Sequence, residues 1–459
     1  MSGKPSIVVD AFRRLRAPAR AVVANASPGA LWYQCSVLGL AVAVIYTNLP
    51  IHVYTWHAAL PPKYAFFVLF LLMTPLLLTR QAALVAYLLS PFALWAGALI
   101  ILNLIHLSAW AAEGNLVDHA SQLRAGLVLT RIQYILFAVF LGFAVFVTPV
   151  RTYLAAAAAL MVLLPGAVLV DFAYPGMFYS LDTEGAVLGR AAATFINPTM
   201  AGEALLHVFL LGCVFVGRSW RGPLFLLAGA AVFATFSRSS IIAWGAILAI
   251  LVARGALPRS MAAITLGALA ILVLCVGSFE SYLHARDGFE AASSNLVSRL
   301  EFFSNLNFDD DSSEERAGVV KAGWEMFLRH PVFGAGAGAT QFWAYRGGTH
   351  NQLVMLAAEY GVFGIVLWVW LLAILWRGRF LPERGLQFAM VFLVAFMSMF
   401  THQMFDSASY WLATFALVAT RAPWTVPGAA QRTTHPRPRV AWHPRAGGVH
   451  GARLNGTRP

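Results

Sequence analysis

Long apolar runs separated by short polar connections recur along most of the chain, and this pattern constrains the fold more than any single motif. A helix that crosses a bilayer needs about 20 predominantly apolar residues. Run length predicts twelve such spans. They lie at 31–48, 64–79, 82–108, 132–149, 153–170, 198–216, 222–236, 240–253, 261–278, 350–376, 385–401 and 407–420. The break at 236–239 could instead be a kink. We therefore predict an all-α, polytopic membrane protein with about 12 transmembrane helices.

Composition excludes a soluble fold. Hydrophobic residues make up 59% of the 459 residues and charged residues 11%, a balance that soluble domains do not have. The formal net charge of +12 would suggest nucleic-acid binding in a soluble protein. Here the basic residues lie between spans, so we predict membrane lipids as partners and no nucleic acid. Cys35, Cys213 and Cys275 fall within apolar spans, at a spacing that suits neither disulfides nor a metal site, so the cysteines say nothing about the chemistry. We predict no cofactor.

The distribution of charge predicts the orientation of the spans. Placing the basic N-terminal segment in the cytoplasm puts most other basic connections on the same side, as the positive-inside rule requires. Asp10 and Glu383 are then the only acidic residues on that side. Both termini are therefore predicted to be cytoplasmic. The chain divides into a basic N-terminus at 1–30, nine spans at 31–278, an outer loop at 279–349, three spans at 350–420 and a disordered basic tail at 421–459.

The outer loop contains a predicted helix at 312–329. Ser312 and Glu315 have the spacing of a capping box at its start. An apolar stripe follows, and the helix is expected to end before Pro331, because the residue that precedes a proline avoids the α region. The stripe consists of Val320, Trp324 and Phe327. We expect this helix to lie along the membrane surface as a lid.

Gly334, Gly336 and Gly338 follow the predicted lid helix. Glycine-rich turns can cradle a phosphate with their backbone amides, although a run of this kind alone is a weak signal.

The tenth predicted span opens with the pattern H-N-x9-G-x2-G, formed by His350, Asn351, Gly361 and Gly364. On a continuous helix the two glycines would lie within about 20° and 40° of His350, on the same face. A groove without side chains below a polar mouth could hold a lipid tail. Alternatively, the glycines only allow a neighbouring helix to approach closely, as small residues do in membranes.

Ionisable residues gather on the predicted outer side, against the orientation bias. They are Arg190, Arg238, Arg316, His350, His402 and Asp406. Arginine matches phosphate oxygens in geometry and charge. A histidine at a helix N-terminus stays neutral and can accept a proton from a hydroxyl. The set therefore favours chemistry on a phosphate-activated substrate at the membrane face.

Individually, these residues also have simpler interpretations. Arg190 or Arg316 could pair with acidic residues in the loops, and His350 could be an interfacial cap. Asp406 could orient His350 or hold Arg238, and His402 could be a helix-end residue.

The motifs resemble those of the O-antigen ligase superfamily, which contains O-antigen ligases, ligase-like O-antigen polymerases and protein O-oligosaccharyltransferases. The resemblance covers 189–364 and is best over the H-N-x9-G-x2-G pattern that follows the outer loop. Also similar are Gly189-Arg190 with Asn197-Pro198, the Ser237-Arg238-Ser239 turn, and the run from Arg316 through His330-Pro331 to Gly336.

The resemblance implies a metal-independent glycosyl transfer at the periplasmic face of the bacterial inner membrane. The donor would be an undecaprenyl-diphosphate-linked glycan, and in a ligase the acceptor would be a sugar hydroxyl of the lipid A core. His350 would activate or position that hydroxyl. Arg190, Arg238 and Arg316 would hold the diphosphate, and the groove below Gly361 and Gly364 would accommodate the prenyl chain. Catalytic roles thus fall on His350, Arg238 and Arg316, and substrate binding on Arg190, Asn351, Gly361, Gly364 and Asp406.

Alternative functions remain at this stage. The motifs do not separate a ligase from an O-antigen or exopolysaccharide polymerase, or from a protein O-oligosaccharyltransferase, because these enzymes differ in their acceptors. The absence of an appended soluble domain and the compact outer loop favour the ligase. A transporter of lipid-linked glycans would carry charged groups along the depth of its pore, whereas here they lie at one mouth.

Overall fold

A computed structural model describes residues 27–112, 119–274 and 311–419, apart from 181, 184, 188, 346, 347, 379, 403 and 407. Over these residues the regular secondary structure is α-helix and short 3₁₀-helix, without a β-strand, which confirms the all-α prediction. The first half contains α2 (Pro28–Tyr46), α3 (Leu49–Trp56), α4 (Pro62–Thr79), α5 (Gln81–Leu88), α6 (Pro91–Ala112), α7 (His119–Val147), α8 (Val150–Ala173), η1 (Ala193–Phe195) and α9 (Pro198–Gly212). The second contains α10 (Arg218–Ala234), α11 (Arg238–Ala253), α12 (Ser260–Leu274), α15 (Asp311–Arg329), α16 (Gln352–Tyr360), α17 (Val362–Arg377), α18 (Arg384–Met397), α19 (Ser409–Ala416) and η2 (Leu417–Ala419).

The number of membrane-length helices differs from the prediction of twelve spans. Among the described residues, five helices are long and apolar enough to cross a bilayer: α2, α4, α6, α7 and α8. Helices α11, α17 and α18 are apolar but shorter. Several predicted spans are interrupted, and a short helix that packs inside protein need not match the thickness of the bilayer, because its ends are satisfied by neighbouring chain rather than by lipid.

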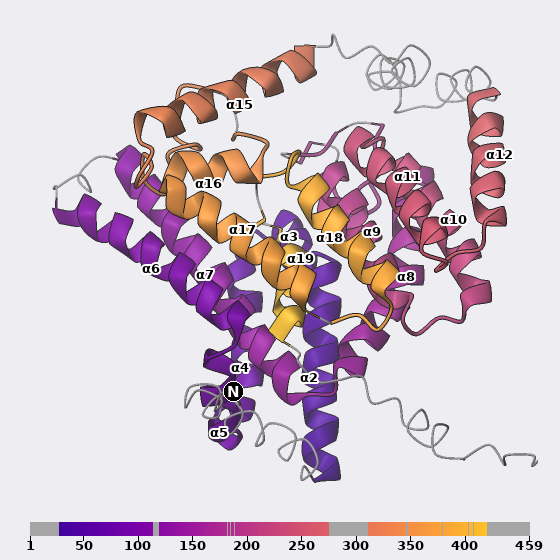
Figure 1. Cartoon of the computed structure of the whole chain (residues 1–459), viewed down its shortest axis with the longest axis horizontal. Helices are drawn as coiled ribbons and strands as arrows, with labels where there is room; N and C mark the ends of the chain where they lie inside the picture. The colour runs from indigo at the N-terminus through magenta and orange to yellow at the C-terminus, as the bar shows by residue number, and fades with distance from the viewer. Residues whose placement is uncertain are drawn as a thin grey trace, which may run out of the picture. The chain divides into compact units, whose positions relative to one another are not determined.

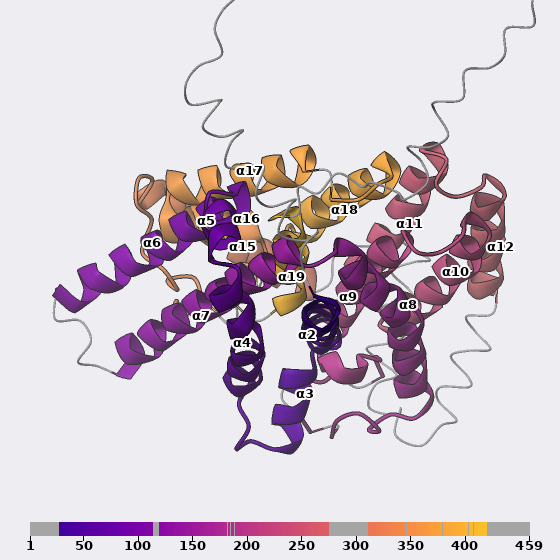
Figure 2. The same ribbon diagram turned by 90° about the horizontal axis from the view of Figure 1, so that it is seen from below.

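Two short helices form the centre of the bundle. All residues of α19 are buried, and in α9 only Thr199 is not. Helices α8, α10, α11 and α18 pack around α9 (Figures 1 and 2). Both helices are predominantly apolar, so run length placed them within the predicted spans 198–216 and 407–420.

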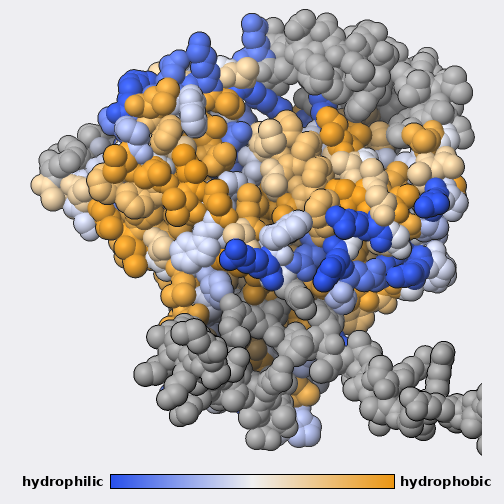
Figure 3. Space-filling view, in the orientation of Figure 1, coloured by the Kyte–Doolittle hydropathy of each residue, from blue (hydrophilic) through white to orange (hydrophobic). Residues whose placement is uncertain are grey.

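The outer surface of the bundle is apolar. Figure 3 shows a band of hydrophobic residues, with hydrophilic residues over α15 on one side of it and near the ends of α17 and α18 on the other. Exposed aliphatic residues such as Leu71, Leu163 and Val366 lie on the long or apolar helices α4, α8 and α17. This surface supports a multi-pass membrane protein.

The predicted continuous helix at 350–376 is wrong. Asn351 caps α16, and the helix stops at Tyr360. Gly361 has φ 63° and ψ −143°, after which α17 begins in a new direction. A residue with side chain at Gly361 would collide with the carbonyl of Val332, and one at Gly364 with the carbonyl of Leu356. The two glycines therefore permit close backbone contacts, and they do not share a helix face with His350.

The predicted lid helix exists as α15 and ends at Arg329, as the following His330-Pro331 required. It lies across α16 (Figure 1). Its buried face, however, is made by Val319 and Ala322, while Trp324 is 45% exposed. Gly323 lies against Val354 of α16. Because the two helices approach closely, α15 packs on α16 through its small residues and not through its aromatic stripe.

Several predictions lie outside the described residues. These are the basic N-terminus up to 26, the loop segment 279–310, the tail from 420 and the side chain of Ser312 in the predicted capping box.

Candidate functional site

One pocket joins residues that are far apart in the sequence. It has an empty volume of about 780 Å³, part of it open to solvent. Its walls are formed by the starts of α9 and α11, by the exposed Arg316 of α15, by His350 just before the cap of α16, and by the connection between α18 and α19. Its lining includes Arg190, Arg238, Arg316, His350 and His402, together with Asn197, Glu203, Ser237 and Thr401.

The backbone is strained at three entries to this pocket. Ile196, Phe236 and His350 have φ of 63°, 47° and 48°, and each stands just before the cap of α9, α11 or α16 or before its first turn. Such values are uncommon for residues with a side chain and persist only where the surroundings hold them. The strained turns bring three helix N-termini, whose amides carry partial positive charge, to one region.

Two of these helices are capped by asparagine. Asn197 accepts hydrogen bonds from the amides of Thr199 at 2.9 Å and Met200 at 3.4 Å. Asn351 accepts from the amide of Val354 at 3.0 Å and does not line the pocket. The observed role of Asn351 is therefore to start α16 just after His350.

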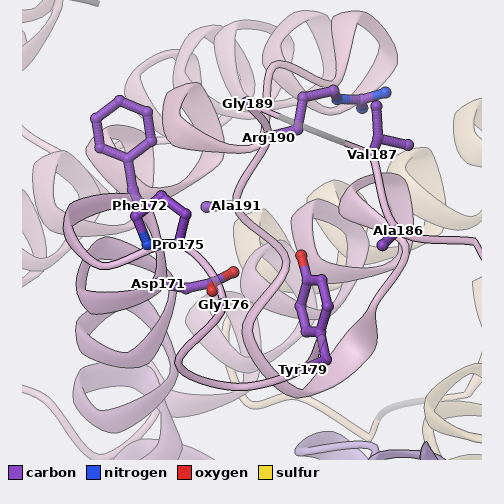
Figure 4. Close-up of a pocket in the computed structure, with 10 residues that line it drawn as sticks. All are labelled: Asp171, Phe172, Pro175, Gly176, Tyr179, Ala186, Val187, Gly189, Arg190 and Ala191. Atoms are coloured by element: carbon purple, nitrogen blue, oxygen red, sulfur yellow. The ribbon is translucent and has the colours of Figure 1, made fainter. Parts of the chain in front are cut away.

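Arg190 is fixed by a loop that Asp171 organises. The Asp171 carboxylate accepts hydrogen bonds from the amides of Ala192 and Ala193, both at 2.8 Å. Tyr179 points its hydroxyl toward the same carboxylate, whereas Arg190 extends away from it (Figure 4). Arg190 Nε donates to the carbonyl of Thr235 at 2.8 Å. Its guanidinium is thereby held beside the turn that leads to Arg238. Residues around Asp171 and Arg190 also enclose a smaller hollow of about 320 Å³.

His350 and His402 form an edge-to-face pair with ring centres 5.1 Å apart and an interplanar angle of 89°. Gln352 holds the two chain segments together. Its amide donates to the carbonyl of Ser398 at 2.7 Å, and its side-chain oxygen accepts from the amide of Met404 at 3.1 Å. Gly348 lies so close to the His402 ring that a side chain would collide with it.

Both imidazoles are neutral at neutral pH. Burial, with smaller contributions from the neighbouring His402 and Arg316, lowers the pKa of His350 to about 4. Burial likewise lowers the pKa of His402 to about 4. The sequence predicted a neutral histidine from the helix N-terminus, but the larger causes are desolvation and the adjacent basic groups.

Asp406 is not part of the pocket lining, and its hydrogen bonds involve neither His350 nor Arg238, the two partners that the sequence suggested. Its Oδ2 accepts hydrogen bonds from Arg131 at 3.3 Å and from Gln341 at 3.2 Å. Burial raises the pKa of Asp406, while Arg131 opposes the shift. Asp406 therefore belongs to a second cluster beside the pocket.

Arg131 is the centre of this second cluster. It is fully buried in α7 and donates to Glu359 at 2.7 Å and to the Tyr360 hydroxyl at 2.8 Å, besides Asp406. Sequence reasoning missed it, because the predicted span began at 132 and left Arg131 in a loop. The signal was available: an arginine followed by a long apolar run marks an intramembrane charge that needs a partner.

The glycine run after α15 is a structural turn and not a phosphate cradle. Gly334, Gly336 and Gly338 all have positive φ. The amides between them are already used: Ala335 donates to the carbonyl of Ala358, Gly336 to that of Glu359, and Ala337 to His106 Nδ1. Arg124 additionally binds the carbonyls of Ala335 and Ala337.

A model of a known family matches part of the chain. Residues 223–369 match the model of the family described as O-Antigen ligase. The matched stretch runs from α10 into α17 and contains Arg238, Arg316 and His350. The match covers less than half of the chain and supports a relationship to the O-antigen ligase superfamily.

Members of this family are glycosyltransferase-like enzymes. The motif resemblance began at 189, whereas the family match covers 223–369. Arg190, Glu203 and His402 lie outside the matched stretch, and the fold brings them to the pocket. No curated protein matches the chain.

Proposed function

We propose that this protein is an O-antigen ligase-like glycosyltransferase. It moves a glycan from undecaprenyl diphosphate to a sugar hydroxyl of the lipid A core, at the periplasmic face of the inner membrane, with both termini cytoplasmic. The observation that carries the proposal is that Arg190, Arg238, Arg316 and His350 line one pocket within the O-antigen ligase superfamily fold.

The arginines suit a diphosphate. Their planar, permanently charged groups match phosphate oxygens, and the start of α11 adds backbone amides at the same place. Charge builds up on the leaving diphosphate as its bond to the sugar breaks. Donors that are fixed in advance stabilise this charge without reorganising, and Arg190 is held in such a way by Thr235.

His350 suits the acceptor side. A neutral imidazole can accept a hydrogen bond from the attacking hydroxyl and orient it. The diphosphate is a good leaving group, so no acid is needed to protonate it, and the chemistry requires no metal ion. Metal independence and the roles of these residues are predictions for experiment.

The alternative enzymes and the alternative transporter fit this arrangement to different degrees. A polymerase or protein O-oligosaccharyltransferase would use the same donor pocket with a different acceptor, so the geometry supports either equally well. A transporter of lipid-linked glycans needs polar groups along a path. The cluster around a single pocket is less suited to that function.

The decisive experiment is transfer in vitro with purified protein, a synthetic undecaprenyl-diphosphate glycan, lipid A–core and EDTA. His350→Ala and Arg238→Ala are compared with Arg259→Ala, an exposed arginine outside the pocket. We expect wild type and Arg259→Ala to glycosylate the core and the two pocket variants to lose at least about 100-fold in rate.

Each other outcome has a clear meaning. Lengthening of the donor glycan without core attachment would make the protein a polymerase. Equal rates in all three variants would contradict the proposed site. Absence of transfer to any acceptor, with flux in sealed vesicles, would favour the transporter.

A further inference from the structure

Glu203 of α9 lines the same pocket, but the family resemblance assigns it no role. The residue is fully buried. Its Oε2 accepts hydrogen bonds from the Tyr410 hydroxyl at 2.5 Å and from Trp411 Nε1 at 2.9 Å. Its Oε1 is also buried and has no hydrogen-bond partner among the described residues.

This environment is unusual for a carboxylate. Burial of a charged group is costly unless a cation or several hydrogen bonds compensate it. Both donors to Glu203 are neutral, and they serve one oxygen only. In the part of the chain that the structure describes, the ion pairs involve Glu359, Asp406 and Glu383 but not Glu203. A group that enters the pocket can supply the donor that Oε1 lacks.

The chemistry of the pocket identifies that group as a hydroxyl. The arginines in the lining attract phosphate oxygens, which are acceptors and cannot donate to a carboxylate. A sugar hydroxyl donates one hydrogen bond and carries the nucleophilic oxygen. It can therefore donate a hydrogen bond to Oε1 of Glu203 while the diphosphate binds to the arginines.

We propose that Glu203 is a catalytic residue that binds the acceptor hydroxyl and takes its proton during transfer. The proposal rests on the proposed glycosyltransferase function. As the acceptor oxygen forms its bond to the anomeric carbon, the bond between that carbon and the phosphate oxygen breaks, and its electron pair leaves on the diphosphate. The proton of the hydroxyl passes to Oε1, which neutralises the buried carboxylate.

His350 complements this role instead of duplicating it. With a pKa lowered to about 4, its imidazole accepts a hydrogen bond but holds a proton poorly at neutral pH. His350 then positions the hydroxyl, and Glu203 is the final proton acceptor.

A purely structural role for Glu203 makes a different prediction. In that case the carboxylate only anchors Tyr410 and Trp411, and any group that accepts their hydrogen bonds would serve. Glu203→Gln keeps such an oxygen but cannot take a proton. Tyr410→Phe is the matched control, because it removes one of these anchoring bonds and leaves Oε1 unchanged.

The test compares wild type, Glu203→Gln, Glu203→Ala and Tyr410→Phe in single-turnover glycan transfer. Thermal unfolding in detergent and binding of undecaprenyl diphosphate are measured on the same samples. For Glu203→Gln we expect a rate loss of at least about 100-fold, with diphosphate affinity and unfolding temperature close to wild type. Formate is expected to restore part of the rate in Glu203→Ala, and Tyr410→Phe to retain most of it.

The opposite results are equally specific. A Glu203→Gln enzyme that keeps the wild-type rate overturns the proposal. So does a parallel loss of rate and unfolding temperature in Glu203→Gln and Tyr410→Phe, because Glu203 would then be a structural carboxylate only. These failures differ from failure of the proposed function, in which wild type itself transfers to no acceptor. In that event the catalytic role of Glu203 falls with it.

Discussion

Glu359 and Glu203 are both fully buried, but their surroundings are opposite. Glu359 meets Arg131 at 2.7 Å through one oxygen and the Thr340 hydroxyl at 2.6 Å through the other. Glu203 has two neutral donors on one oxygen and an unsatisfied second oxygen. Both oxygens of Glu359 therefore have partners, whereas Oε1 of Glu203 has none among the described residues.

The two glutamates belong to regions with different roles, one that holds the fold together and one that lines the candidate active site. The Arg131 cluster joins α7, α16 and the connection between α18 and α19, and thereby fixes the segments that carry His350 and His402. The pocket beside it carries arginines, neutral histidines and an incompletely satisfied carboxylate. Substitutions in the first region should lower stability, and those in the second should lower activity in a folded protein.

The largest expected effect is that of Arg131→Ala. It leaves Glu359 and Asp406 buried without their cation, which costs about 3–5 kcal/mol. We expect loss of most folded protein from the membrane fraction, measured by fluorescence-detected size exclusion. Arg151→Ala, at an exposed arginine of α8, is the control. Equal yields of the two variants would contradict the architectural role of Arg131.

Gly361→Ala is expected to have the next largest effect on stability. The left-handed backbone at this position and the collision with the Val332 carbonyl together cost about 3 kcal/mol. The unfolding temperature should fall strongly, while Gly245→Ala, which faces open space in α11, should leave it unchanged or raise it. If Gly361→Ala instead unfolded normally and lost donor binding, the glycines would belong to a prenyl groove and not to the Glu359 region.

Glu359→Gln tests the comparison directly. An amide cannot form the ion pair with Arg131, so we expect about 2 kcal/mol of destabilisation in chemical unfolding. Glu203→Gln should unfold almost as wild type, because Tyr410 and Trp411 keep an acceptor. Similar destabilisation by both substitutions would remove the distinction between the two regions.

Arg238→Lys probes the pocket more gently. Lysine keeps the charge but loses the planar fork that binds two phosphate oxygens at once. We expect about a 10-fold rise in KM for the diphosphate donor and no change in unfolding. The conservative Arg259→Lys serves as the reference, and a KM unchanged from it would argue against a bidentate contact.

The smallest expected effect concerns pH. The pKa of His402 is lowered to about 4 by burial, below the value of about 6.5 in an unfolded chain. The unfolded state therefore binds protons first, and the stability contributed by neutral His402 is complete above pH 6.5 and is lost as the pH falls toward 4. His402→Asn should unfold with a weaker dependence on pH in this window, whereas His57→Asn, at an exposed histidine, should not. Parallel pH curves for all three proteins would contradict this.

Sequence reasoning predicted the helical class, the helix at 312–329 and, apart from Asp406, the ionisable residues that line the pocket together. Residue chemistry is local, so an arginine or histidine against the orientation bias can be recognised without coordinates. The end of the lid helix was likewise predictable, because Pro331 acts through its own neighbours.

The failures have a common physical cause. Apolar run length does not distinguish lipid from protein as the surroundings of a helix, so it could not predict that α9 and α19 are short and almost entirely buried by protein. Gly361 was assigned to a helix face because its left-handed backbone depends on the approach of Val332, a contact between separate segments. Glu203 was overlooked because a carboxylate in an apolar run has no meaning until its partners, more than 200 residues later, are known.

The Arg131 cluster has a consequence for biogenesis. Its carboxylates, Glu359 and Asp406, follow Arg131 by 228 and 275 residues. During synthesis, α7 therefore reaches the membrane with a cation whose partners do not yet exist, and a charge at that depth cannot settle in lipid without cost. Until α16 and the segment before α19 emerge, Arg131 must stay near water or be shielded by the insertion machinery. A nascent chain that ends before Glu359 contains Arg131 without either of its carboxylates, and such an intermediate carries an uncompensated buried arginine.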